Sequence, residues 1–206
     1  MPADRNASLF GLFRPKLPLR YGLAACYLTL NDDRYTQETI ALRNTPELSR
    51  FVHADRLTVE THERWLAEQL DRDDALNFAL IVRRRFAGTV SLYNVEHGRQ
   101  CELGRLMVPN DGRRFYVLAG CMLAMSFAFE VLGLPTLYSV VVAGNRRVFN
   151  LAVRNGWKAD PRYDTRIPLN GELAELRGLS FSRADWPAWF ARRQPLLQRI
   201  LGARRV

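Results

Sequence analysis

Two adjacent arginines open the least charged helix that the sequence predicts. Residues 109–134 read PNDGRRFYVLAGCMLAMSFAFEVLGL, and after Arg114 their only charged side chain is Glu130. A helix N-terminus presents free N–H groups and about half a positive charge. It binds phosphate readily when a turn leads into it from a strand, and arginines add charge-assisted hydrogen bonds. From Arg113 and Arg114 alone, a phosphate site and a capped helix start with two solvated arginines both remain open.

A strand on each side frames this helix. The preceding run CELGRLMV (101–108) contains Gly104, which indicates a bulge or a close backbone approach. The following run TLYSVVV (136–142) is continuously apolar, as is typical of a strand buried in a parallel pair. Strand, helix and strand then form a right-handed crossover. The apolar positions of the helix recur at helical spacing, at Phe115, Leu118, Met122, Met125, Phe129 and Leu132.

The other elements predict an α/β fold, of the α+β kind, with a mixed sheet. Thr58 is expected to cap a helix whose apolar face comprises Val59, His62, Leu66 and Leu70. Asn170-Gly171 is a hairpin signal. The further predicted helices cover residues 34–43 and 145–157, and the further predicted strands cover 26–30, 77–83, 86–94, 162–169 and 173–181.

Length and charge favour one domain with basic ends. The chain has 206 residues, enough for a core, and we predict this domain over 23–185. The net charge is +9, but the N-terminal extension (1–22) holds four basic residues and one acid, and the C-terminal tail (186–206) holds five arginines and no acid. The body is therefore nearly neutral, which argues against binding to nucleic acid.

Several classes of protein are disfavoured by composition. No apolar run is long enough to span a bilayer, and the first residues lack the regions of a signal peptide. The three cysteines lack CxxC spacing, which argues against a disulfide framework or a zinc site and for a reducing, cytoplasmic location. We expect no metal cofactor.

The two ends combine basic and large apolar residues. They either pack on the domain or a second subunit, giving a homo-oligomer, or anchor the protein at a membrane surface. Pro15, Pro18 and Pro195 are expected to break any amphipathic helix there, which favours packing.

The order of elements from about Tyr27 to Trp186 resembles the GNAT N-acetyltransferase superfamily. The order is most similar to that of the branch that contains ribosomal-protein N-terminal acetyltransferases and amino-sugar-nucleotide N-acetyltransferases. The segments that carry the resemblance are ALRNTPEL (41–48), THERWL (61–66), AGTVSLYNV (87–95), CELGRLMV (101–108), FAFEVLGL (127–134), NRRVFNLAVRNGW (145–157) and GELAELRGLSFSRADW (171–186). The resemblance implies a GNAT-like fold with a splayed central sheet and a strand–helix–strand unit for acetyl-CoA.

The resemblance also implies where acetyl-CoA binds. The coenzyme is expected where 101–108 and 136–142 splay apart, and Asn145 matches the family asparagine that bonds it, with an ordinary helix N-cap as the alternative. Backbone groups of three strand residues would hold the pantetheine and thioester: Leu106, Met107 and Val108. The diphosphate is expected on the loop from Asn110, at Arg113, Arg114, Phe115, Tyr116 and Val117.

One departure from the family pattern concerns that loop. Phe115 and Val117 stand where the family has glycines, which allow a backbone to approach a phosphate closely. Either Asp111-Gly112 provides the turn and the arginines clamp the phosphates, or coenzyme affinity is low. A non-catalytic GNAT-like binding domain is the corresponding alternative.

Acetyl transfer needs a base, because an ammonium group is not nucleophilic. Glu102, on the strand expected to face the coenzyme, is the candidate; a carboxylate paired with Arg105 is the alternative. The family's tyrosine acid, seven residues after Asn145, is absent because Ala152 stands there. The candidates to replace it are Tyr138, Tyr116 and Tyr93, of which we place Tyr138 in the catalytic role and Tyr93 on the acceptor.

Arg43 and Asn44 occupy the position near which this branch binds acceptors, with a helix C-terminal cap as the alternative. The positive charges of Arg43, Arg50 and Arg56 favour an acidic ligand. We therefore predict an acetyl-CoA-dependent N-acetyltransferase, an acyltransferase acting on the primary amine of a small molecule such as an amino-sugar nucleotide. A protein N-terminal acetyltransferase is the runner-up.

Overall fold

The computed structural model describes residues 20–23, 25–49, 51, 56–109 and 115–201. Its strands form a mixed sheet in the order β1-β2-β3-β4-β5-β6-β9-β7, with β8 paired to β9. The strands are β1 (Tyr21–Leu23), β2 (Cys26–Leu30), β3 (Leu76–Val82), β4 (Arg85–Glu96), β5 (Gln100–Met107), β6 (Thr136–Val142), β7 (Lys158–Ala159), β8 (Thr165–Leu169) and β9 (Glu172–Ser182). Among these pairings only β5 and β6 run parallel.

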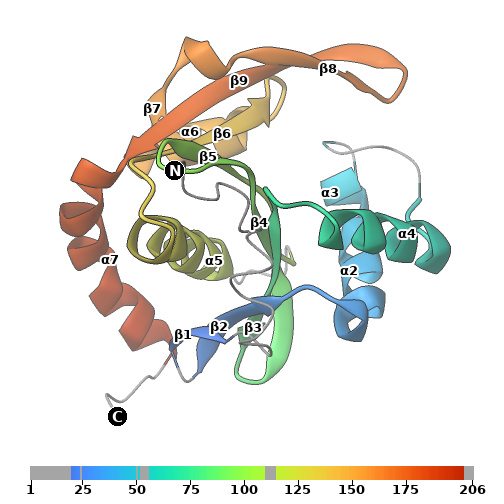
Figure 1. Ribbon diagram of the computed structural model, residues 1–206, viewed down its shortest axis with the longest axis horizontal. Coiled ribbons are helices and arrows are strands. Elements are labelled where there is room, and N and C mark those ends of the chain that lie inside the picture. Colours follow the sequence, from blue (N-terminus) through green and yellow to red (C-terminus); the bar gives the residue numbers. More distant parts are fainter. Residues whose placement is uncertain (1–19, 24, 50, 52–55, 110–114, 202–206) are drawn as a thin grey trace, which may run out of the picture.

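Helices cover both faces of the sheet (Figure 1). One layer holds α2 (Thr36–Arg43), α3 (Pro46–Ser49) and α4 (Val59–Leu70), and the opposite layer holds α5 (Phe115–Ser126) and α7 (Trp186–Leu201). The helix α6 (Arg146–Arg154) follows β6, and short helical turns precede α2, β8 and α7 at η2 (Asp33–Tyr35), η4 (Pro161–Tyr163) and η5 (Arg183–Asp185). The arrangement confirms the mixed α/β fold and the β5–α5–β6 crossover expected from the sequence.

The helix α5 lies in the core because nearly all its faces are apolar. Met122, Met125 and Phe129 are fully buried, as their helical spacing predicts. The helix continues as a π-helical turn, η3 (Phe127–Val131), before Gly133 reverses the chain with φ of +68°. The covered helix that the sequence predicts is confirmed.

Two local expectations were wrong. Thr58 does cap α4 in a capping box with Thr61, but Val59 is 41% exposed, and the buried face comprises His62, Leu66 and Gln69. Side chains on a helix point toward its N-terminus. The side chain of Val59, in the first turn, therefore points beyond the end of the helix and does not join the buried face.

The second correction concerns Pro195, which does not break the C-terminal helix: α7 runs through it to Leu201. Trp186 and Trp189 before the proline and Leu197 after it are all buried in the core, and their packing outweighs the lost backbone hydrogen bond. In the part of the chain described here, no helix is long and apolar enough to cross a membrane.

Candidate active site

The central sheet opens between β5 and β6. The two strands pair only at Gln100–Thr136, Cys101–Leu137 and Glu102–Tyr138. Beyond that point β5 stays with β4, while β6 pairs with β9 as far as Val142. Within the described residues, the β6-facing edge of 103–107 has no strand partner, so its backbone N–H and C=O groups are available to a ligand.

A bulge shapes β5 just beyond the opening. The register passes from Ser91–Gly104 to Thr89–Met107, so β5 carries one residue more than β4 over this stretch. Arg105 takes the left-handed conformation with φ of +51°, and the Thr89 hydroxyl donates to its carbonyl oxygen at 3.0 Å. The bulge or close approach predicted from Gly104 is confirmed.

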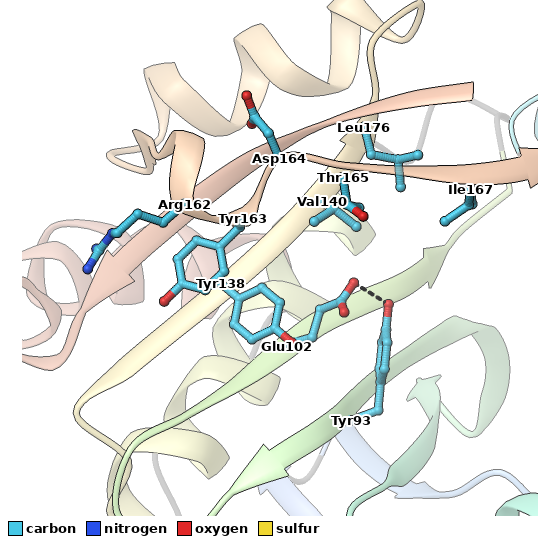
Figure 2. A pocket seen from close by; sticks show the side chains of 10 residues that line it. All are labelled: Tyr93, Glu102, Tyr138, Val140, Arg162, Tyr163, Asp164, Thr165, Ile167 and Leu176. Carbon is cyan, nitrogen blue, oxygen red and sulfur yellow. Dashed lines mark hydrogen bonds between the residues drawn. The ribbon is translucent and has the colours of Figure 1, made fainter. Parts of the chain in front are cut away.

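A pocket of about 520 Å³ lies beside the opening, which is large enough for a small-molecule ligand. Its polar side chains come from β4, β5, β6 and the segment from η4 to the start of β8, and its apolar wall comes from β6 and the β8–β9 hairpin (Figure 2). The residues that line it are Tyr93, Glu102, Tyr138, Val140, Arg162, Tyr163, Asp164, Thr165, Ile167 and Leu176.

Glu102 is the buried carboxylate of this pocket, with 6% of the residue exposed. The Tyr93 hydroxyl donates to its Oε1 at 2.5 Å, drawn in Figure 2, and the Asn94 amide donates to Oε2 at 3.1 Å. Burial raises the pKa of Glu102, while these two hydrogen bonds and the charge of Arg105 oppose the rise. A carboxylate with a raised pKa accepts a proton more readily, which suits a general base.

Tyr138 lies next to Glu102 across the last β5–β6 pair and is stacked on Tyr163. Their ring centroids are 4.3 Å apart and the planes differ by 3° (Figure 2). The Tyr163 hydroxyl donates to Gln100 Oε1 at 2.6 Å, which ties the stack to the start of β5. Burial and the nearby Glu102 charge raise the pKa of Tyr138, so its hydroxyl stays protonated near neutral pH and is able to donate a proton.

The structure brings together the predicted residues Glu102, Tyr138 and Tyr93, but Arg43 and Asn44 lie elsewhere. Neither of the last two lines the pocket. The Asn44 side-chain amide accepts from Leu57 N at 2.9 Å and donates to Leu57 O at 2.8 Å, so it closes the segment between α2 and α4. Asn44 is also the C-cap of α2, where its backbone N–H donates to the Ile40 carbonyl, which is the role that the sequence left as its alternative. Arg43 ends α2, where burial lowers its pKa.

The residues expected to hold acetyl-CoA lie in several different parts of the structure. Leu106 and Met107 end β5 at its open edge and Val108 follows, which fits an extended amide-bearing arm lying along that edge. Asn145 caps α6 by accepting from Val148 N at 3.3 Å, its alternative role. Phe115, Tyr116 and Val117 form the first turn of α5, whereas Arg113 and Arg114 lie outside the described residues.

The first turn of α5 therefore presents side chains where the family pattern has glycine. Phe115 packs edge-on against Tyr116, with ring centroids 4.4 Å apart, and Tyr116 is buried. This turn does not offer a phosphate the close backbone approach that glycine gives. The preceding loop residues 110–114 lie outside the part of the chain that the structure describes.

Sequence reasoning missed the wall made by the chain after α6. The hairpin at Asn170-Gly171 was predicted and is present, but nothing local showed that it reaches over the β5–β6 opening. Residues 162–163 were predicted as strand and instead belong to η4, which turns Tyr163 toward Tyr138. The composition RYDTRIPL is compatible with either conformation, so only packing decides.

Comparisons with known proteins add the family. The family model described as "Acetyltransferase (GNAT) domain" matches residues 28–158. No curated protein matches the chain by sequence.

Solved structures match the fold at low identity. A GCN5-related N-acetyltransferase from Brucella melitensis is 22% identical, with a TM-score of 0.74 over 87% of this chain and 86% of that one. The apo form of a nucleotide-linked sugar GNAT is 16% identical, with a TM-score of 0.72 over 88% and 99%. Spermidine N-acetyltransferase from Vibrio cholerae, solved with CoA and spermine, is 14% identical, with a TM-score of 0.68 over 80% and 99%.

Proposed function

This chain belongs to the acetyltransferase (GNAT) domain family, and on that premise we propose that it transfers the acetyl group of acetyl-CoA to a primary amine held in the pocket beside Glu102. The proposal rests on one observation, the position of Glu102 in the sheet and in the pocket. It is the last β5 residue paired with β6, and its carboxylate faces the pocket at the mouth of the opening.

Each part of the site has a role in this reaction. Acetyl-CoA supplies an activated thioester when bound, with its pantetheine along the open edge of β5 at Leu106, Met107 and Val108. Glu102 takes a proton from the acceptor amine, directly or through water. Backbone N–H groups on the same open edge stabilise negative charge on the carbonyl oxygen. Tyr138, kept protonated by its surroundings, returns a proton to the departing thiolate.

For the acceptor we propose a small molecule such as an amino-sugar nucleotide. The pocket combines a polar floor at Glu102 and Tyr93 with an apolar wall at Val140, Ile167 and Leu176. Such a lining suits an amine on a partly apolar ring or chain. The likeness in fold to a nucleotide-linked sugar GNAT supports the choice, although it extends only to the fold. Arg43 and Asn44 do not line this pocket, so their place in acceptor binding rests on the family resemblance.

A second candidate is a domain that binds acetyl-CoA weakly or without turnover. It is favoured by one observation, the Phe115 and Val117 side chains in the first turn of α5. We place the protein in the cytoplasm in either case, on the pattern of its cysteines.

The test is a panel of amines scored by release of free CoA thiol. It includes UDP- and dTDP-linked amino sugars, spermidine and peptides with free N-termini. We expect turnover with at least one small-molecule amine and its loss in Glu102→Gln. Turnover with peptides alone would assign the runner-up. Acetyl-CoA binding by calorimetry without turnover of any amine would assign the binding domain.

A further inference from the structure

Arg105 holds an unusual place beside the candidate base. It is half-buried, and its left-handed backbone at the β5 bulge is a conformation that residues other than glycine rarely adopt. Bulges redirect side chains, and strained backbone of this kind persists where the surroundings hold it. The bulge carries the Arg105 side chain to the α4 side of the sheet, where it meets Gln69 of α4 and Asn77 of β3.

The contacts of Arg105 are with neutral groups. One guanidinium nitrogen donates to Gln69 Oε1 at 2.8 Å and to Asn77 Oδ1 at 2.9 Å. The guanidinium carbon lies 4.3 Å from the ring centroid of Tyr93 and 5.3 Å from that of Trp65. Among the described residues, Arg105 belongs to none of the ion pairs.

These contacts fix the orientation of Tyr93. A planar guanidinium against a ring face restricts how the ring turns and adds cation–π attraction. The hydroxyl of that same ring makes the 2.5 Å hydrogen bond to Glu102. A displacement of the Arg105 side chain is therefore passed to the carboxylate through one rigid ring.

We propose that Arg105 is a positioning residue for the base, which holds Tyr93 against Glu102 and links both to α4 through Gln69 and Trp65. It touches neither the amine nor the coenzyme in this scheme. The inference rests on the proposed function, because it assigns Arg105 a part in the reaction. A purely structural tie between α4, β3 and β5 is the competing reading, and it predicts a loss of stability with a wild-type kcat in the folded, charge-keeping variant Arg105→Lys.

The charge of Arg105 also acts on the titration of Glu102. The groups that face it are Tyr93 from β4, Cys101 and Arg105 from β5, and Tyr138 from β6. Of these only Arg105 is positively charged, and its charge lowers the Glu102 pKa. Removing that charge raises the pKa further, so the basic form of Glu102 is reached at higher pH.

The experiment compares Arg105→Met, Arg105→Lys and the matched control Arg192→Met, an exposed arginine of α7. We expect Arg105→Met to lower kcat about 10- to 100-fold, as small misplacements do, to leave the KM for acetyl-CoA near wild type, and to move the acid limb of kcat/KM to higher pH. Arg105→Lys keeps the charge but not the planar stack, so kcat falls while the limb stays. Arg192→Met should match wild type in kcat, in the KM for acetyl-CoA and in the pH of the acid limb.

Two further measurements keep the result decisive. In a cycle with Tyr93→Phe, the effects of Arg105→Lys and Tyr93→Phe on kcat should be less than additive, since both act on one hydrogen bond; this cycle serves even if Arg105→Met does not fold. If no amine is turned over by wild type, the proposed function fails, but carboxyl NMR of Glu102 still tests the contact: its pKa should rise in Arg105→Met, and in Arg105→Lys its chemical shift should change because the Tyr93 hydrogen bond is displaced. A wild-type kcat in folded Arg105→Lys with additive effects in the cycle would overturn the proposal. Without turnover, a wild-type Glu102 chemical shift in Arg105→Lys would overturn it.

Discussion

Gly104 leaves the space that the Tyr93 hydroxyl occupies. A Cβ on Gly104 would lie 2.5 Å from Tyr93 Oη, closer than a real Cβ approaches another atom. Because the same hydroxyl donates to Glu102, a methyl group at position 104 presses on the hydrogen bond of the candidate base. Glycine is therefore required here by a neighbouring side chain rather than by a positive φ.

Gly104→Ala should lower kcat by about 10- to 100-fold, since displacements of this order at a site have such effects. Tyr93→Phe alone also lowers kcat, because it removes the donor to Glu102. In the Tyr93→Phe background the added methyl group meets only ring carbon, at 3.0 Å, so the double variant should be hardly slower than Tyr93→Phe. Steady-state kinetics of the three variants check this; independent, multiplying losses would show that the methyl group acts elsewhere.

Glu102→Gln should reduce kcat by about 10²- to 10⁴-fold while leaving acetyl-CoA binding nearly unchanged. The loss should shrink at high pH, where more of the amine is already free. A pH–rate profile with a calorimetric titration gives both quantities. A near wild-type rate at neutral pH would remove Glu102 from the reaction.

The same substitution has an opposite effect on stability. Burial raises the folded-state pKa of Glu102 above its unfolded value, so the contribution of its protonated form is present at low pH and is lost as pH rises through the folded pKa. Wild type should thus lose stability relative to Glu102→Gln with rising pH. Urea unfolding of both at several pH values measures it, and parallel curves would contradict it.

Acetyl-CoA should stabilise the fold by about 2.7 kcal/mol at about 100-fold excess over Kd. Because Phe115 and Val117 replace glycines, Arg113 and Arg114 are expected to carry more of the diphosphate binding. Replacing both by alanine should raise the KM for acetyl-CoA and affect kcat less. A thermal-shift titration tests the stabilisation, and no shift in wild type would count against coenzyme binding. Steady-state kinetics test the two arginines, and an unchanged KM for acetyl-CoA in the double variant would refute their role in binding the diphosphate.

Asn44→Ala should lower the free energy of unfolding by about 1–3 kcal/mol, since it removes two hydrogen bonds to the Leu57 backbone. If Asn44 serves only this closure, the acceptor KM of the folded variant stays near that of wild type. Asn44→Asp, which keeps the acceptor for Leu57 N but not the donor, is the graded control. A large rise in acceptor KM without destabilisation would restore Asn44 to the acceptor site.

The prediction that the C-terminal tail packs on the domain is tested on α7, the helix that this tail forms. Trp189 is buried and its indole N–H donates to the Asn155 carbonyl, whereas Leu196 on the same helix is 48% exposed. Trp189→Ala should destabilise the protein by about 3–5 kcal/mol, and Leu196→Ala by less than about 0.5 kcal/mol. Denaturant unfolding compares the two. Salt-sensitive co-sedimentation of the intact protein with anionic liposomes would instead favour a membrane anchor.

Much of the fold follows from local patterns in the sequence. The helical spacing of Phe115 to Leu132, the capping of α4 by Thr58 and the hairpin at Asn170-Gly171 are properties of neighbouring residues, and the structure contains each. The parallel pairing of β5 and β6 follows from the length of the crossover between them. Faces and ends of elements, such as Val59 and Pro195, were misjudged, and the short elements β1, α3 and β7 were not predicted, because packing partners decide them.

The sequence by itself determined the fold, the family and the strand from which Glu102 points. Tertiary structure alone decided what surrounds that carboxylate, because the surrounding groups are distant in the chain. Tyr163 reaches Tyr138 across 25 positions, and Arg105 reaches Gln69 across 36. Gly104 predicts the bulge locally, but the partners that the bulge and the packed layers bring together are specified by no local preference. The pKa of Glu102 depends on burial among these distant groups, so the chemistry of the site is a property of the folded chain.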